Sequence, residues 1–312
     1  MQTQMDETSI QRHEMILAML THLYRGRFAP SPTGALHAGS LATALGSWLC
    51  ARVNHGTWLI RIEDVDTTRT VTGATEHILH QLSRCGLNSD EPVIYQSKRG
   101  VHYQSALNEL KNRDKAYACR CTRRQIELAL EEKGFQRQRH QELPYPGTCR
   151  DRADVCEPCA WRLKVDDASI FSEVGDFVLR RADGIYAYQL AVVVDDHLQS
   201  ITHVVRGSDL EDNTPRQNYL QQQLNYSIPK YTHLPIVNNQ DGEKLSKQSG
   251  ALPIDVKTDT DVLQALRDAA LHLSLTDARL YSKATSISNW LEIALESAKL
   301  DAQEKRILWL QL

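Results

Sequence analysis

The chain has 312 residues, enough to bury a substantial core in one large domain with an appendage or in two modest domains. Apolar residues make up 41% of the chain and charged residues 24%, as in an ordinary soluble enzyme. No stretch approaches the roughly 18 consecutive apolar residues of a membrane span, so we expect no membrane attachment. Acidic residues precede the first apolar run, Met15 to Leu20, whereas a secretory leader would be basic there. We expect a cytoplasmic protein whose first 24 residues form a helical extension.

The net charge of −3 does not by itself indicate a nucleic-acid partner, because phosphate binding needs clustered Lys and Arg. Between Lys111 and His140, however, nine Lys or Arg stand against four Asp or Glu. This segment is either a solvated helical surface or an insert that faces a polyanion. Seven cysteines make an odd count, which disfavours a disulfide framework. Five of them lie between Cys119 and Cys159, which indicates metal binding in a reducing compartment.

Strand and helix patterns alternate along the first hundred residues or so. Apolar spacing and turn residues predict strands over Tyr24 to Phe28 and Thr57 to Glu63, and helices over Ala38 to Val53, Thr75 to Cys85 and Gly100 to Arg113. This order predicts a parallel, doubly wound α/β sheet.

The segment Ala118 to Trp161 interrupts the rhythm with cysteines, charges and prolines, and we interpret it as an insertion. Regular structure resumes with Ala187 to Val194. His203 to Leu210 predicts a strand that leads into a turn, and Pro215 predicts a helix with a capping residue just before a first-turn proline. The spacing is helical from Asp261 onward. The expected parts are an extension (1–24), a sheet domain in two pieces (25–117 and 162–252), the insertion (118–161) and a C-terminal helical region (253–312).

The motif RFAPSPTGALHAGS, Arg27 to Ser40, joins a strand to a helix through a turn rich in Gly, Pro and Ser. The free N–H groups at such a helix start bind phosphate. His37 could donate a hydrogen bond to phosphate oxygens as charge develops on them, and Gly39 lets a nucleotide approach without a Cβ in the way. Alone, a histidine near a helix start is more often an ordinary surface residue with its hydrogen bonds satisfied.

A second motif, DGEKLSKQ, follows about two hundred residues later. Lys244 and Lys247, on either side of Ser246, could neutralise a triphosphate and the leaving pyrophosphate. Alone, this fragment is better interpreted as an exposed basic turn after Asp-Gly.

Together the two motifs resemble the signatures of class I aminoacyl-tRNA synthetases, and RFAPSPTG is similar to the glutamyl and glutaminyl branch. The resemblance covers roughly Arg25 to Leu252 and implies a Rossmann-type catalytic domain that uses ATP with Mg²⁺. It implies that His37, Lys244 and Lys247 are catalytic. The ATP-binding positions it implies are His37, Gly39, Ser40, Lys244, Ser246 and Lys247.

A pocket selective for L-glutamate needs two guanidinium-type partners for its carboxylates and one acid for its ammonium. Arg27 and Arg206 could pair with one carboxylate each, and Glu63 with the ammonium, but the sequence does not say which arginine takes which carboxylate. Considered singly, Glu63 or Tyr188 is better interpreted as an ordinary surface residue at a strand end. The positions that the resemblance assigns to the amino-acid site are Arg27, Phe28, Ala29, Pro30, Ser31, Glu63, Tyr188 and Arg206.

The cysteines suggest one Zn²⁺, which prefers four ligands in a tetrahedron. Spacing alone favours Cys119, Cys121, Cys156 and Cys159. The resemblance to short glutamyl-synthetase-like proteins instead implies Cys119, Cys121, Tyr145 and Cys149. Both sets stay open at this point.

About sixty residues follow KLSKQ, too few for the helical domain with which a glutamyl-tRNA synthetase reads the anticodon. CRCTRRQ and RGSDLEDNTPRQ also resemble truncated paralogues, the glutamyl-Q tRNA(Asp) synthetases. This resemblance implies that the enzyme activates glutamate as glutamyl-adenylate. The glutamate is then transferred to queuosine in the anticodon loop of tRNA(Asp), and no charging of the tRNA 3′ end is involved. The alternatives are a truncated glutamyl-tRNA synthetase that charges a 3′ end, and a non-catalytic tRNA-binding regulatory paralogue.

Overall fold

A computed structural model describes residues 24–134, 143–152, 154–235, 252–282, 284–304 and 306–310. The predicted alternation of strands and helices is confirmed over the first third of the chain, and three parallel strands pair in the order β1-β2-β3. The elements in chain order are β1 (Arg25–Phe28), α2 (Ala38–Val53), β2 (Thr57–Ile62), α3 (Ala74–Arg84), β3 (Ile94–Tyr95), a 3₁₀ turn (Gln96–Lys98) and α4 (Gly100–Asn112).

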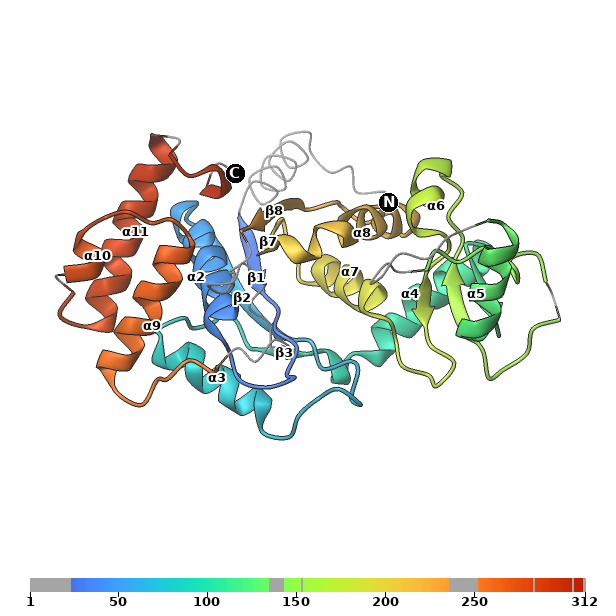
Figure 1. The fold of residues 1–312 in the computed structure, drawn as a ribbon, viewed down its shortest axis with the longest axis horizontal. Coiled ribbons are helices and arrows are strands. Elements are labelled where there is room, and N and C mark those ends of the chain that lie inside the picture. Colours follow the sequence, from blue (N-terminus) through green and yellow to red (C-terminus); the bar gives the residue numbers. More distant parts are fainter. Residues whose placement is uncertain are drawn as a thin grey trace, which may run out of the picture.

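A second parallel pair extends this layer. β7 (His203–Gly207) pairs with β8 (Lys230–Leu234), and the Thr202 N–H donates to the Arg25 carbonyl over 3.0 Å, which brings the start of β7 beside β1. Between and after these strands come α7 (Tyr188–Leu198), a 3₁₀ turn (Ser208–Asn213) and α8 (Thr214–Gln223). Figure 1 shows β7 and β8 next to β1, with α7 and α8 between the sheet and the right-hand end of the molecule.

Asn213 stands at the N-cap position of α8, and Pro215 lies in its first turn as predicted, but the Asn213 side chain forms no capping hydrogen bond. Its Oδ1 instead accepts a hydrogen bond from the Gln189 side chain over 2.6 Å. A tertiary contact has therefore displaced the local cap.

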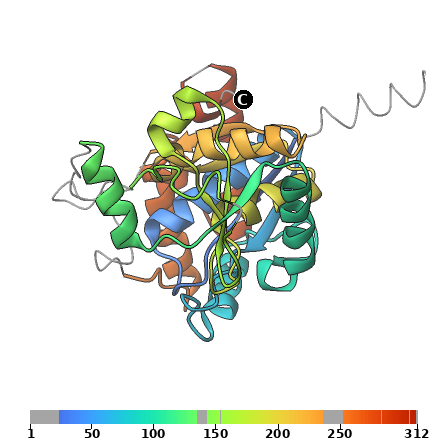
Figure 2. The ribbon, with the colours of Figure 1, turned by 90° about the vertical axis from the view of Figure 1, so that its right-hand side faces the viewer.

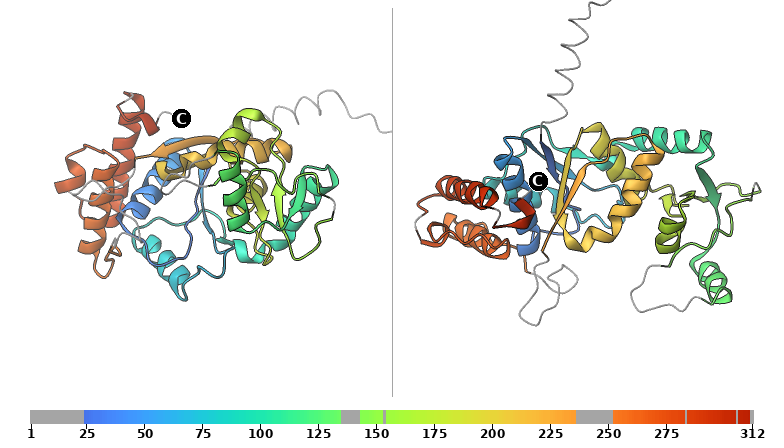
Figure 3. Two further views of the ribbon diagram at one scale, coloured as in Figure 1. Left: turned by 45° about the vertical axis from the view of Figure 1, so that its right-hand side comes forward. Right: turned by 90° about the horizontal axis from the view of Figure 1, so that it is seen from above.

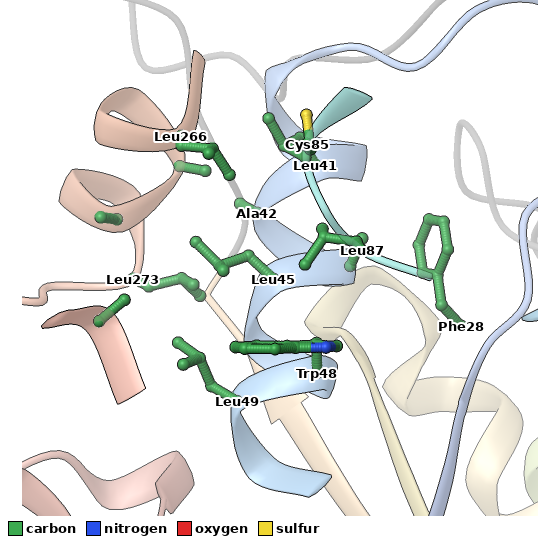
Figure 4. Close-up of a cluster of buried hydrophobic side chains, with 14 of the residues drawn as sticks. Phe28, Leu41, Ala42, Leu45, Trp48, Leu49, Cys85, Leu87, Leu266 and Leu273 are labelled. Atoms are coloured by element: carbon green, nitrogen blue, oxygen red, sulfur yellow. The ribbon is translucent and has the colours of Figure 1, made fainter. Parts of the chain in front are cut away.

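The largest core surrounds α2. Leu41, Leu45 and Leu49 recur every four residues, so they lie on one helical face, and all are fully buried. Figure 4 shows Leu45 and Leu49 on the side of α2 that faces α9 (Asp259–His272) and Leu273, which directly follows it. Two further helices, α10 (Arg279–Ser282) and α11 (Ile287–Gln303), and a 3₁₀ turn (Leu308–Leu310) complete this end, so the predicted helical region after Asp261 is confirmed.

A separate antiparallel sheet lies at the opposite end of the molecule, as the view from above in Figure 3 shows. Its strands run in the order β4-β5-β6. The elements are β4 (Ala116–Cys119), α5 (Arg123–Glu132), β5 (Ala160–Leu163), α6 (Ala168–Val174) and β6 (Val178–Arg180).

Figure 2, viewed from this end, shows α5 to one side of the sheet. Thr122 and Gln125 start α5 with a reciprocal capping box. Among the described residues, no helix is both long and apolar enough to cross a membrane.

Candidate functional site

The carboxyl ends of β1, β2 and β7 open into a cavity of about 590 Å³. Open α/β sheets bind ligands at this edge, because the loops that follow parallel strands converge there. Every described residue predicted for the nucleotide or the amino acid lines this one cavity. They are Arg27, Phe28, Ala29, Pro30, Ser31, His37, Gly39, Ser40, Glu63, Tyr188 and Arg206.

The N-terminus of α2 forms one wall of the cavity. His37 occupies the N-cap position, and its Nδ1 accepts a hydrogen bond from the Ser40 N–H over 3.4 Å. Because a neutral imidazole carries one proton, Nδ1 as acceptor places that proton on Nε2, which becomes a donor. A helix start with its free N–H groups and an imidazole donor can bind phosphate.

Arg27, near the end of β1, is buried and already paired. Its Nε and Nη2 donate to the two carboxylate oxygens of Asp196 over 3.0 and 3.3 Å. The adjacent guanidinium groups hold the pKa of Asp196 below its ordinary value, although burial alone would raise it. Arg27 is therefore a fixed cation whose position depends on a residue outside the cavity lining.

Glu63 directly follows β2, and its side chain is 7% exposed. Its Oε1 accepts one hydrogen bond from Arg61 over 3.2 Å. Burial raises the pKa of Glu63 against the lowering effect of Arg61 and Arg27.

The half-buried Tyr188 is the first residue of α7 and does not end a strand. Burial, followed by the charge of Glu63, raises the pKa of its phenol to about 12.

Arg206, on β7, faces the same cavity with a different environment. Its guanidinium donates to Gln217 over 2.8 Å, to Thr214 over 2.7 Å and to His233 over 3.3 Å. All three partners are neutral acceptors, and no carboxylate of the described residues forms an ion pair with it. Burial lowers the pKa of Arg206. A buried guanidinium surrounded by neutral groups gains stability from an incoming carboxylate.

The second motif, with Lys244, Ser246 and Lys247, lies outside the described residues. Of the predicted site, the described cavity thus contains the amino-acid positions and the first phosphate motif.

Cys119, Cys121 and Cys149 form a group that could hold a metal ion, with sulfur atoms within 4.8 Å of one another. The Tyr145 hydroxyl oxygen lies 3.2 Å from the sulfur of Cys119 and 3.3 Å from that of Cys121. Gly175 permits this arrangement, because its φ is +63° and an added Cβ would lie 2.7 Å from the backbone N and O of Tyr145.

The other two cysteines of the insertion do not join this group. Cys156 is exposed. Cys159 is buried, and its backbone N–H donates to Glu157 over 3.1 Å. Cys50 and Cys85 are buried in the main core, as predicted, and burial raises the pKa of each thiol to about 12.

The family model of the catalytic domain of class I tRNA synthetases (E and Q) matches residues 24–302. The glutamyl-Q tRNA(Asp) synthetase of Cupriavidus metallidurans is 48% identical over 292 residues, which cover 88% of this chain and 91% of the relative. The chain belongs to the glutamyl-Q tRNA(Asp) synthetase family. The corresponding enzyme of Burkholderia cenocepacia is 51% identical over 269 residues, covering 81% and 88% of the two chains. Family membership confirms the predicted enzyme class, a ligase-type tRNA synthetase of the glutamate branch.

The fold comparison agrees with this family. The crystal structure of a glutamate tRNA ligase from Elizabethkingia meningosepticum, in complex with its amino acid, superposes with a TM-score of 0.70 at 25% identity. The match covers 86% of this chain and 64% of the ligase, so the chain spans less than two thirds of that protein's length. The predicted Rossmann-type class I fold is confirmed.

Sequence reasoning missed two residues that organise the site in this family member, Arg61 and Asp196. Both are buried, and each is hydrogen-bonded to a residue that lines the cavity, Asp196 to Arg27 and Arg61 to Glu63. A signal was present, because Asp195 and Asp196 follow three consecutive valines in an apolar helical stretch. Charged residues almost never lie in such a stretch unless they are paired.

Proposed function

We propose that the cavity binds ATP with Mg²⁺ and L-glutamate and forms glutamyl-adenylate. An oxygen of the glutamate α-carboxylate attacks the α-phosphorus of ATP, and pyrophosphate leaves. The observation that carries the proposal is Arg206, a buried cation with no ion-paired carboxylate among the described residues. A substrate carboxylate supplies the missing partner.

The charges of the pocket suit glutamate. Three buried cations (Arg27, Arg61 and Arg206) stand against two acids (Glu63 and Asp196), which leaves one positive charge. Glutamate carries two carboxylates and one ammonium, hence one negative charge. We propose that Arg206 and Arg27 each face a carboxylate and that Glu63 accepts the ammonium. Phe28, Ala29, Pro30, Ser31 and Tyr188 shape the rest of the pocket.

We propose that phosphate is handled by the α2 terminus and the second motif. His37 donates through Nε2 to the phosphate oxygens, with Gly39 and Ser40 at the helix start. Lys244, Ser246 and Lys247 receive the triphosphate and leaving pyrophosphate.

We propose that the activated glutamate passes to queuosine in the anticodon loop of tRNA(Asp), as the names of the relatives suggest. The insertion, residues 118–161, would face the RNA, and residues 25–117 with 162–252 would form the catalytic domain of a cytoplasmic enzyme. The deciding measurement is which nucleotide of tRNA becomes labelled by radioactive glutamate. A label on the 3′-terminal ribose would indicate a truncated glutamyl-tRNA synthetase instead.

As the pH is lowered, glutamate binding should begin to weaken at a higher pH than it would if Glu63 had the pKa of an ordinary carboxyl group. Glu63 must be ionised to accept an ammonium, and burial raises its pKa. Hence kcat/KM for glutamate should fall as pH decreases through this raised pKa and recover above it. The measurement is a pH profile of glutamate-dependent pyrophosphate exchange, with Glu63→Gln as comparison. An unchanged acid limb in the variant would contradict the assignment.

We propose that Cys119, Cys121, Tyr145 and Cys149 hold one structural Zn²⁺. Tetrahedral zinc with Zn–S bonds of about 2.3 Å separates its sulfur ligands by roughly 3.8 Å. The Cys121 and Cys149 sulfurs lie 3.4 Å apart, so the donors fit after a small expansion. Bound zinc would crosslink β4 to the Tyr145 loop, far along the chain from the phosphate motifs.

Metal analysis of single variants tests this ligand set. One zinc per chain should survive dialysis in the parent protein and be lost or weakened in Cys119→Ser, Cys149→Ser and Tyr145→Phe. Cys156→Ser is the matched control and should keep the metal, because Cys156 is exposed and outside the group. Loss of zinc in Cys156→Ser and Cys159→Ser with retention in Tyr145→Phe would establish the other set. Chelation should lower the melting temperature more than it lowers the rate of glutamate activation.

A further inference from the structure

The buried carboxylate of Asp196, on α7, does not line the cavity but accepts hydrogen bonds from two arginines at the cavity end of the sheet. Asp196 Oδ1 accepts from Arg27 Nε over 3.0 Å and from Arg61 Nη1 over 2.8 Å, and its Oδ2 accepts from Arg27 Nη2 over 3.3 Å. Arg61 in turn donates to Glu63 over 3.2 Å and to Gln199 over 2.9 Å. The chain Arg27–Asp196–Arg61–Glu63 therefore connects a cavity cation to the cavity acid through two side chains that do not line the cavity.

This hydrogen-bonded network is shielded from water. The side chains of Arg27, Arg61 and Asp196 are 4%, 0% and 4% exposed. A planar guanidinium with two fixed partners has little freedom to turn, and buried ion pairs are screened little by salt. The distance between Arg27 and Glu63 is thus set by Arg61 and Asp196.

We propose that Asp196 and Arg61 are positioning residues that hold Arg27 and Glu63 apart, so that the amino acid enters with one orientation. The proposal rests on glutamate activation at this cavity. Without the Asp196 carboxylate, Arg27 would lose its ion-pair partner and turn toward Glu63, whose Oε1 already accepts from Arg61. Both oxygens of Glu63 would then be occupied by guanidinium groups, and its site for an ammonium would be lost.

The neighbouring residue provides a matched control. Asp195 has the same side chain, lies on the same helix and is 0% exposed, but it pairs with Arg99, Tyr103 and Gln96. None of these three partners lines the cavity. Loss of a buried, paired carboxylate should destabilise both variants similarly, whereas only Asp196→Asn should disturb the substrate.

The experiment is glutamate-dependent ATP–pyrophosphate exchange by the full chain and by Asp196→Asn and Asp195→Asn. Asp196→Asn should raise KM for glutamate by about 10- to 100-fold, the range expected for losing hydrogen bonds between charged groups. KM for ATP and kcat should change by less than about threefold, because the lost interaction is uniform binding. Asp195→Asn should keep KM for glutamate within about threefold despite a comparable fall in melting temperature. Equal KM effects in the two variants, or no KM effect in Asp196→Asn, overturn the proposal.

Arg61→Lys covers the case in which Asp196→Asn does not fold. Lysine keeps the positive charge beside Asp196 but lacks the fork that reaches Gln199 and Glu63 as well. It should therefore fold and still raise KM for glutamate by about 10-fold, and an unchanged KM would contradict the proposal. If the parent protein itself shows no glutamate-dependent exchange, the proposed function fails and this inference with it. A normal parent with unaffected variants refutes the inference alone.

Discussion

Purified protein is expected to exchange pyrophosphate into ATP when glutamate is present and RNA is absent, and His37→Ala should slow this exchange by about 100-fold or more. The physical reason is the position of His37 at the start of α2, where Nδ1 accepts from Ser40 and leaves Nε2 as a donor. A preorganised donor that strengthens as charge develops on phosphate lowers the barrier more than it tightens ground-state binding. The variant should therefore lose kcat and keep KM for glutamate.

Lys247→Ala is expected to show a similar loss, since its ammonium would neutralise the leaving pyrophosphate. Matched controls are His77→Ala and Lys257→Ala, which remove exposed side chains of the same types outside the cavity. Both controls should exchange at the parent rate. Robust exchange by a His37→Ala, Lys247→Ala double variant would refute the assignment of the phosphate site.

The regular part of the fold was predictable because its signals are local. Helix α2 follows from apolar residues spaced four apart between a turn and Asn54, and its predicted bounds match the structure. β1 and β2 likewise match their predicted ranges within one residue at each end. The antiparallel β4-β5-β6 sheet was not predicted, because its strands are only three or four residues long and their pairing joins segments about forty residues apart.

The site shows the same division. Arg27, His37 and Glu63 were singled out because they lie at strand ends or a helix start in recognisable motifs. Arg61 and Asp196 were missed, because they act through a hydrogen bond to each other. That bond joins β2 to α7, two elements that lie more than a hundred residues apart in the sequence. Sequence pattern identifies side chains that face a ligand more readily than the buried charges that hold them.

The insertion that we propose faces the RNA has side chains suited to phosphate. Arg123 and Arg124 on α5 are 75% and 69% exposed, and their contacts with Glu127 are long, at 3.8 and 3.9 Å. Lys111 lies over the Trp161 ring at 3.7 Å. Exposed guanidinium groups bind phosphate in a salt-dependent way, so the basic segment from Lys111 to His140 is our candidate for gripping a single RNA stem-loop.

An isolated anticodon stem-loop of tRNA(Asp) that carries queuosine is expected to accept glutamate, whereas the same stem-loop with guanosine in its place should accept none. The reason is chemical. The cyclopentenediol ring of queuosine supplies hydroxyl nucleophiles for the activated carboxyl group, and guanosine has no such ring. Charging should weaken as salt increases, and it should persist in full-length tRNA that lacks the 3′-terminal adenosine. Label on the 3′-terminal ribose would replace the proposed acceptor with a tRNA end. Label on neither site, in protein that still activates glutamate, would show that the activated amino acid goes to a different acceptor and would overturn the transfer half of the proposed function.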